Sequence, residues 1–397
     1  MKNIANTAIL LFLFSAMLSC NSTQRITTNK TLEKDLRQTM LLSKKQYEYF
    51  ATRIPDSLFP KTFENGKHVF CKSWDWVSGF YPGTLILLSD YFKDENLYNL
   101  AVPKLDLLKK EQFNKNTHDL GFMMYCSFGN AIKSHPGKNY DTILLNSAES
   151  LASRYNPKVQ AIKSWDSRSK DDFLVIIDNM MNLELLFWAS RFTGDPQYAE
   201  IAVNHANTTM KNHFRDDYSS YHVVNYNPLT GEVNKKHTHQ GAYDESAWAR
   251  GQAWALYGYT LMYRETKDRQ YLDMADKIAV YIIKNLPGDY IPVWDFNAPE
   301  LNKHYKDASA GAIIASALLE LYKYSPQNAR QYVTVAENIL SSLRSENYFA
   351  GYTQNGGFLL KHSVGHLPRN SEVDVPLTYA DYYFIEAMLR YSDLNRK

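Results

Sequence analysis

The chain has 397 residues, 45% of them hydrophobic, and its 44 Lys and Arg residues nearly balance 42 Asp and Glu residues to give a net charge of +2. A chain of this length can bury a large core, either as two ordinary domains or as one closed architecture. The near-neutral charge argues against nucleic acid as a partner, because no basic stretch interleaved with aromatic residues is present to neutralise phosphates.

The N-terminus predicts an export signal. Residues 1–19 carry Lys2, an apolar stretch over residues 8–18 and small residues before Cys20, and the apolar stretch is too short to span a membrane. The sequence MLSC resembles a bacterial lipobox, although Leu18 stands where a small residue is usual. We therefore expect Cys20 to be acylated and to become the first residue of the mature protein.

The expected lipid anchor also predicts a location. Residues 21–23 lack the acidic run that resembles a surface-export tag, so we expect a periplasmic protein that is lipid-anchored to the membrane. Residues 20–31 would form a short linker, and residues 32–397 would form one domain.

Two kinds of helical segment alternate along that domain. Amphipathic segments with charged faces are predicted at residues 32–54, 97–113, 140–155, 196–214, 269–286 and 330–347. Segments that are apolar or small nearly all round stand at residues 79–92, 119–132, 178–192, 249–264, 307–324 and 379–392. Since a helix without a polar face must be buried on every side, six outer and six inner helices predict an all-α (α/α)6 barrel, a toroid of six helical hairpins. The similar openings DPQY, DRQY and ARQY of three outer segments support a repeat.

The polar and small residues of the inner segments gather near their N-terminal ends, at Gly79, Asp119, Asp178, Arg250, Asp307 and Asp381. If the hairpins run the same way round the ring, these ends meet at one mouth, walled by the connecting residues 221–246 and 286–304. Asp also favours helix N-caps for ordinary reasons, and we favour that interpretation for Asp307 and Asp381.

Asp178 stands in a strongly apolar run. Residues 173–190 are rich in Ile, Met, Leu, Phe and Trp, yet they contain Asp178 with Asn179 and Asn182 beside it. A buried carboxylate without a partner costs several kcal/mol or takes up a proton. Asp178 is therefore either paired or an acid.

Five blocks of sequence carry a family resemblance. They are HDLGF, IDNMMNLELLFWAS, SAWARGQAWALYGY, DASAGAIIASALLEL and SEVDVPLTYADYYFIEAMLR. In content and order they resemble glycoside hydrolase family 88, the unsaturated glucuronyl hydrolases, and the resemblance covers nearly the whole chain after the export signal. It implies the same (α/α)6 barrel, and an enzyme that removes unsaturated uronic acid from di- or oligosaccharides.

The resemblance also implies roles for single residues. Asp178 falls on the family's general acid/base, and Asp119 falls on its second catalytic carboxylate. The positions that look like its sugar contacts are Trp76, Trp165, His222, Gln240, Arg250 and Trp254. Residues 360–374, with Ser363, His366 and Arg369, are expected beside the leaving sugar, although a solvated loop that only makes turns would also fit.

The implied chemistry explains a carboxyl group in apolar surroundings. A lyase product ends in a uronic acid whose C4=C5 double bond is a vinyl ether, and its hydration begins with a proton added to C4. Met180, Met181 and Phe187 would desolvate Asp178, and a second carboxylate nearby would raise its pKa further, so that it stays protonated near neutral pH. We expect Asp178 to donate this proton and Asp119 to stabilise the resulting cation.

Other readings of the site remain open. A relative that acts on unsaturated galacturonyl or rhamnogalacturonyl ends, as in glycoside hydrolase family 105, would share the fold and the acid. A non-catalytic glycan-binding lipoprotein would use the high aromatic content of 14% without turnover. A conventional hydrolase of saturated glycosides would need no double bond. The parent polysaccharide and its sulfation are undetermined.

Metal and cofactor chemistry finds little support. His237 and His239 stand together, but no carboxylate or thiol follows at the spacing of zinc ligands. No glycine-rich phosphate loop or nucleotide fingerprint is present. Cys71 and Cys126 favour two buried thiols over a disulfide. We therefore expect neither a metal nor a cofactor.

Overall fold

Helices dominate the computed structural model, which describes residues 28–167 and 169–395. The expected export signal and Cys20 lie outside the described residues. The outer segments form α1 (Lys30–Ala51), α3 (Glu95–Leu108), α5 (Tyr140–Ala152), α7 (Pro196–Asn212), α9 (Arg269–Asn285) and α11 (Ala329–Leu343). The inner segments form α2 (Phe80–Phe92), α4 (Phe128–Ser134), α6 (Leu183–Thr193), α8 (Ala249–Thr266), α10 (Ala308–Leu321) and α12 (Thr378–Ser392). Within the described part, no helix is both long enough and apolar enough to span a bilayer.

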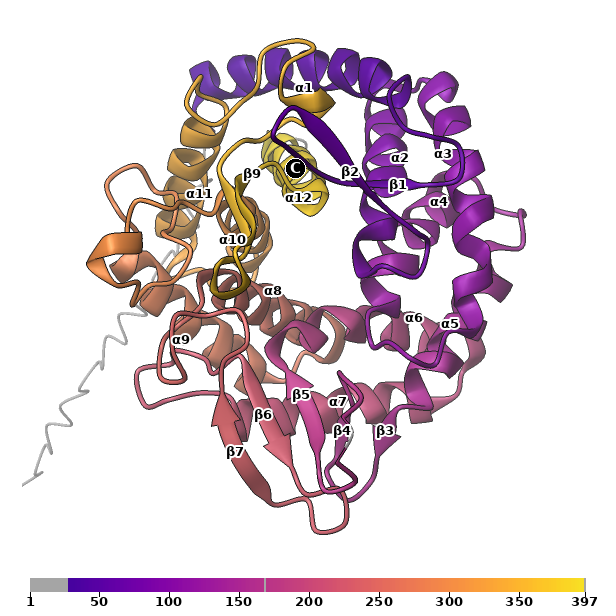
Figure 1. Ribbon diagram of the computed structural model, residues 1–397, viewed down its shortest axis with the longest axis vertical. Coiled ribbons are helices and arrows are strands. Elements are labelled where there is room, and N and C mark those ends of the chain that lie inside the picture. The colour runs from indigo at the N-terminus through magenta and orange to yellow at the C-terminus, as the bar shows by residue number, and fades with distance from the viewer. Residues whose placement is uncertain (1–27, 168, 396–397) are drawn as a thin grey trace, which may run out of the picture.

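The burial of the two sets follows their hydrophobic patterns. Every residue of α8 from Ala249 to Met262 is buried, whereas α9 buries one stripe that includes Tyr271, Ala275 and Ile278. An apolar stripe at this spacing faces a core on one side only. Figure 1 accordingly shows α8, α10 and α12 near the centre and α1, α9 and α11 at the periphery.

The inner helices contact one another in a closed order. α12 packs on α2, α2 on α4, α8 on α10 and α10 on α12, while a short π-helical turn, η3 (Gly121–Tyr125), joins α4 to α6, which packs on α8. Each inner helix from α2 to α10 also contacts the outer helix that follows it in the chain, and α1 contacts both α12 and α2. The first and last parts of the sequence are therefore neighbours in space.

Two inner segments begin irregularly, which the sequence did not predict. The turn η3 follows Asp119, and a 3₁₀ helix, η4 (Ile177–Asn182), contains Asp178 ahead of α6. A Cβ atom at Gly121 would lie 2.4 Å from Asn182 Cα, so only glycine allows the two elements to approach this closely. The Phe122 N–H donates to Asn182 Oδ1 at 3.0 Å and fixes the contact. Asp119 and Asp178 thereby lie on adjacent elements.

Short antiparallel strands replace several expected loops, so the all-α expectation holds only for the main framework. β5 (Phe173–Ile176), β6 (Val223–Tyr226) and β7 (Val233–His237) form a three-stranded sheet in which Val175 pairs with Val224. The two-stranded sheets are β1 (Phe59–Glu64) with β2 (Lys67–Cys71), β3 (Tyr155–Asn156) with β4 (Ala161–Ile162), and β8 (Ser363–His366) with β9 (Ser371–Val375).

The two acids expected to be N-caps differ. Asp307 caps α10 by accepting the Ser309 N–H at 3.1 Å, as expected. The expectation for Asp381 is wrong, because this residue lies inside the first turn of α12, whose N-cap is Leu377. Its fully buried carboxyl group accepts the Tyr47 O–H and two backbone N–H groups, so it joins α1 to α12 and to the chain before β8.

Charged side chains join four inner helices far from Arg250 and Asp307. Arg264 of α8 donates to Glu184 of α6 and to Glu320 of α10, the latter at 2.9 Å. Arg390 of α12 pairs with the same Glu320 at 3.0 Å. We call Glu184, Arg264, Glu320 and Arg390 the Arg264 network. It lies about 20 Å from Arg250 along α8, since fourteen residues separate the two arginines.

The two described ends of the chain also meet. The Asn29 N–H, at the N-cap of α1, donates to the Tyr391 hydroxyl of α12 at 3.0 Å and to Glu337 of α11 at 3.1 Å. Tyr391 in turn donates to Glu337 at 2.5 Å. The start of the first helix is thus fastened to the end of the last.

Removal of Arg264 should destabilise the fold strongly. Arg264→Met leaves Glu320, whose side chain is only 6% exposed, without one of its two cations, and the free energy of unfolding should fall by about 3–5 kcal/mol. Urea denaturation followed by circular dichroism measures the change. Lys303→Met, which removes an exposed pair with Glu300, is the control and should cost below about 0.5 kcal/mol. Equal losses would show that the network contributes no more than a surface ion pair.

Candidate active site

Two carboxyl groups stand on the adjacent elements η3 and η4. Asp119 precedes η3, accepts the Thr117 hydroxyl at 2.9 Å, and lies 3.4 Å from His118 Nε2. Asp178 lies in η4, is 8% exposed, and its Oδ2 atom is buried without a hydrogen-bond partner among the described residues. The first carboxyl group is therefore held by its neighbours, and the second is free to act on a bound molecule.

Burial raises the pKa of Asp178 to about 7, and the negative charge of Asp119 acts in the same direction. The positive charge of Arg250 lowers the pKa of Asp178 and offsets part of this rise. Burial also raises the pKa of Asp381 to about 7, but that carboxyl group is fully enclosed and accepts three hydrogen bonds. Of the two, only Asp178 combines a neutral-range pKa with an unpartnered oxygen.

His222 faces Asp178 in one defined tautomer. Its Nδ1 atom accepts the backbone N–H groups of His239 at 3.2 Å and Gln240 at 3.1 Å. Burial lowers the pKa of His222 well below its ordinary value, so the ring is neutral and must carry its hydrogen on Nε2. That atom lies 3.8 Å from Asp178 Oδ2. The loop after β7 thus aims an N–H donor at the acid.

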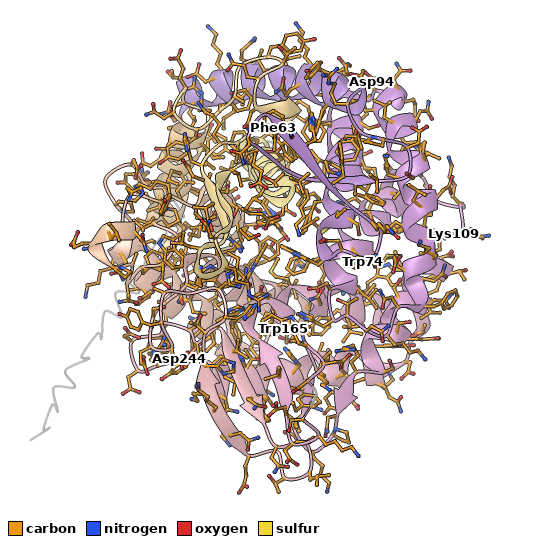
Figure 2. All side chains as sticks on the ribbon, in the orientation of Figure 1. Phe63, Trp74, Asp94, Lys109, Trp165 and Asp244 are labelled. Carbon is orange, nitrogen blue, oxygen red and sulfur yellow. The ribbon has the colours of Figure 1, made fainter. Side chains whose placement is uncertain are left out.

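Aromatic rings lie next to His222, on the side chains of Trp165 and His239. Trp165 lies edge-on to His222, with ring centroids 5.8 Å apart, and also contacts His239. His239 contacts His366 of β8 at 4.6 Å. Neither ring nitrogen of His366 has a hydrogen-bond partner in the part of the chain that the structure describes, and burial lowers the pKa of His366 to about 4. Figure 2 shows Trp165 at the end of the three-stranded sheet nearest the centre of the molecule.

Arg250 is fully buried and engaged with the protein. Its guanidinium donates to Asp307 at 3.0 Å and to the Val364 and Gly365 carbonyls of β8. Trp248 lies 4.4 Å from the guanidinium carbon. The Gln240 side chain donates to the same Gly365 carbonyl at 2.9 Å. Both predicted sugar contacts therefore position the β8 strand. Arg250 Nε has no hydrogen-bond partner among the described residues.

Two predicted sugar contacts lie deeper than expected. Trp254 is fully buried, with its ring 5.0 Å from Phe122 and 5.3 Å from Tyr383. Ser363 is also fully buried, and its hydroxyl oxygen accepts the Ser309 N–H at 3.2 Å. Both side chains are enclosed by the protein in this structure, and their contacts with a sugar stay predictions.

The remaining predicted residues, Trp76 and Arg369, are more exposed than Trp254 and Ser363. Trp76 is half-buried against Tyr379, 4.8 Å between rings, and against Phe122. The neighbouring Trp74 is 62% exposed, so Trp76 is the tryptophan that belongs to the cluster. Arg369 is exposed on the turn η7 (Leu367–Arg369), and its charge lowers the pKa of His366 and of His239.

Arg154 is a structural residue of the site that the sequence did not reveal. Its guanidinium donates to the carbonyls of Lys115, Lys163 and Ser164. These contacts join the segment before Asp119 to the segment before Trp165. Main-chain carbonyls leave no sequence pattern, so no motif marks such a residue. Asn182, in contrast, could be found from its place in the apolar run beside Asp178.

Possible metal ligands and cysteine thiols also occur in the described part of the chain. Across residues 28–167 and 169–395, no three His, Cys, Asp or Glu side chains are grouped so that they could hold a metal ion. Cys71 and Cys126 are both free thiols.

Several known proteins are similar to this chain in fold and in sequence. The model of Glycosyl Hydrolase Family 88 matches residues 53–391. An unsaturated glucuronyl hydrolase of Formosa agariphila is 47% identical over 344 residues, 85% of each chain. The crystal structure of an unsaturated glucuronyl hydrolase specific for heparin is similar with a TM-score of 0.89 and 44% identity, over 92% of this chain and 99% of that one. A mutant unsaturated glucuronyl hydrolase of Streptococcus agalactiae, complexed with dGlcA-GalNAc6S, has a TM-score of 0.80 and 29% identity over 94% and 96% of the two chains. With a buried carboxyl acid at its centre, the chain belongs to glycoside hydrolase family 88, as an enzyme of the unsaturated glucuronyl hydrolase class.

Proposed function

We propose that the protein removes the 4,5-unsaturated uronic acid from the non-reducing end of lyase-generated glycosaminoglycan oligosaccharides. The observation that carries this proposal is Asp178, a buried acid with a pKa of about 7 and an unpartnered oxygen next to Asp119. The heparin-specific relative and the relative complexed with dGlcA-GalNAc6S support this substrate class. The match to family 88 favours it over a family 105 activity and over glycan binding without turnover.

The reaction is a hydration of the vinyl ether. The C4=C5 electron pair takes the Asp178 proton at C4, and the ring oxygen stabilises the positive charge left at C5. Water adds to C5 and returns a proton to the Asp178 carboxylate. The resulting hemiketal opens by breaking the bond between C5 and the ring oxygen. The ring oxygen then remains on C1 as a hemiacetal hydroxyl, and collapse of that hemiacetal releases the neighbouring sugar.

The other side chains of the site prepare this step. The His222 Nε2–H lies 3.8 Å from the acid and would donate to a sugar hydroxyl bound next to it. Asp119, held by Thr117, stabilises the cation across the ring. Trp76, Trp165 and His366 supply flat surfaces and unpartnered nitrogens for the substrate. With water as the nucleophile, this hydration requires no nucleophilic side chain.

The scaffold of this site is an (α/α)6 barrel. The closed order of contacts from α2 through α12 and back to α2 supports this architecture. The pairing of each outer helix with a neighbouring inner helix supports it further. In such a barrel the helix starts that carry Asp119, Asp178 and Arg250 share one end.

Loss of the acid should remove turnover. Asp178→Asn should fold and lose activity on an unsaturated disaccharide by about 10²-fold or more, because the amide cannot protonate C4. Loss of the C4=C5 ultraviolet absorbance measures the rate, and saturated uronides should stay intact. For wild type, kcat should fall as pH rises through about 7, where Asp178 ionises.

Thermal stability checks the same ionisation independently. The raised pKa means that folding favours the protonated form of Asp178, so its ionisation costs stability above pH about 3.9, and fully above about 7. The Tm gain of Asp178→Asn should therefore grow across that interval. Asp273→Asn, at an exposed position of α9, should change neither the turnover rate nor the Tm across this pH interval. Near wild-type turnover of Asp178→Asn would place the acid elsewhere.

Arg369 should influence the choice of leaving sugar. Its exposed guanidinium lies close enough to His366 and His239 to lower their pKa values, and it could meet a sulfate on that sugar. Arg369→Ala should change the ratio of turnover between sulfated and unsulfated disaccharides more than it changes kcat for the best substrate. Arg330→Ala, on the exposed face of α11, is the control. A uniform change for every substrate would show that Arg369 does not contact the leaving sugar.

The location is a separate proposal, which rests on residues outside the described part. We propose a periplasmic protein anchored through acylated Cys20. Cys20→Ala should move the protein from the membrane fraction to the soluble fraction, and protease added to intact cells should leave the wild type uncut. Retention of the variant in the membrane, or cleavage from outside, would contradict the proposal.

A further inference from the structure

A positively charged groove is lined in part by Arg154, which also contacts the segments before Asp119 and Trp165. It has a volume of about 670 Å³ and is lined by residues that include Lys115, Arg154, Tyr155, Lys158, Lys163 and Leu229. We call it the β3–β4 groove, because the two short strands carry or border most of these residues. Figure 1 shows β3 and β4 beside the three-stranded sheet, at the edge of the molecule away from α1. We propose that the groove binds a second, saturated stretch of a sulfated or uronate-rich glycan chain.

The charges of the groove favour an anion. Lys115 and Lys158 are exposed, and neither has an acidic partner within residues 28–167 and 169–395. Lys163 and Arg154 share a single acid, Asp166, at 3.3 Å and 3.4 Å. The four cations therefore outnumber the acidic groups that act on them, in a protein whose net charge is only +2. Such a local excess attracts sulfate and carboxylate groups.

The apolar parts of the groove favour a sugar over a bare ion. Tyr155 is half-buried, with its hydroxyl oxygen fixed by a hydrogen bond from Asn204, so its ring is held in place. Leu229 also lines the groove and is 78% exposed, an unusual position for a large apolar side chain. Sugar rings present an apolar C–H face to such surfaces and hydroxyls to the solvent. The volume lies in the range of roughly 300–1,000 Å³ that is typical of small-ligand sites.

The groove is joined to the catalytic centre through the backbone. Lys115 stands four residues before Asp119, and Lys163 stands two residues before Trp165. Arg154 binds the carbonyls of both lysines, so groove and site share one wall. This inference rests on the proposed function, because a hydrolase of glycosaminoglycan fragments works among longer anionic chains. A chain held in the groove would keep the enzyme where fragments are released.

Direct binding to a non-substrate tests the groove. The probe is a saturated sulfated heparin tetrasaccharide, which has no C4=C5 bond, titrated into the full chain by calorimetry. Wild type should bind it, and Lys158→Glu should weaken binding by about tenfold or more. Lys45→Glu, the same charge reversal on exposed α1, should leave the dissociation constant within about twofold. Inorganic sulfate at equal ionic strength should not compete.

A turnover assay distinguishes binding in the groove from catalysis at the active site. Lys158→Glu should hydrolyse an unsaturated disaccharide at the wild-type rate, because Lys158 lies on the turn between β3 and β4 and is exposed. Absence of tetrasaccharide binding, equal binding by Lys158→Glu, or full competition by inorganic sulfate would overturn the groove while disaccharide turnover persists. Absence of disaccharide turnover by wild type would instead overturn the proposed function, whatever the tetrasaccharide does.

Discussion

The buried guanidinium of Arg250 is the interaction on which the arrangement of the site depends. The Arg250 side chain is only 1% exposed. A buried charge of this kind is tolerated only if it is paired and hydrogen-bonded. Arg250 meets this condition with three partners from distant parts of the chain, namely the cap of α10 and two carbonyls of β8. The same charge limits how far burial can raise the pKa of Asp178. One side chain therefore holds the rim of the site and adjusts its acid.

Polar groups are distributed unequally between the two ends of the inner helices. In the Arg264 network both carboxylates, the buried Glu320 and the partly exposed Glu184, have cations within hydrogen-bond distance. Around Asp178, several buried polar atoms lack partners among the described residues, including His222 and His366 nitrogens. Unpaired buried polar groups cost stability and are tolerated where a ligand or water completes them. Polar groups at one end of the inner helices are therefore paired within the protein, whereas those around Asp178 are available to a ligand.

The framework could be predicted because helix periodicity is local. The contrast between α8 and α9 is visible in their sequences, and the apolar run around Asp178 marked it as an acid or a paired group. The strands were missed because four apolar residues such as those of β5 do not differ from a helix start. The depth of Trp254 and Ser363, and the enclosed position of Asp381, depend on which elements pack over them. Local sequence carries no record of that packing.

The contact between Asn29 and Tyr391 bears on when the protein can mature. These residues are 362 positions apart, and the inner helices close only when α12 reaches α2. The contacts between α12 and α2 cannot form while the last helix is still being synthesised. An unfinished chain therefore exposes apolar faces of α2 and of the other inner helices that the folded protein buries. Until α12 arrives, those faces are open to association with other chains.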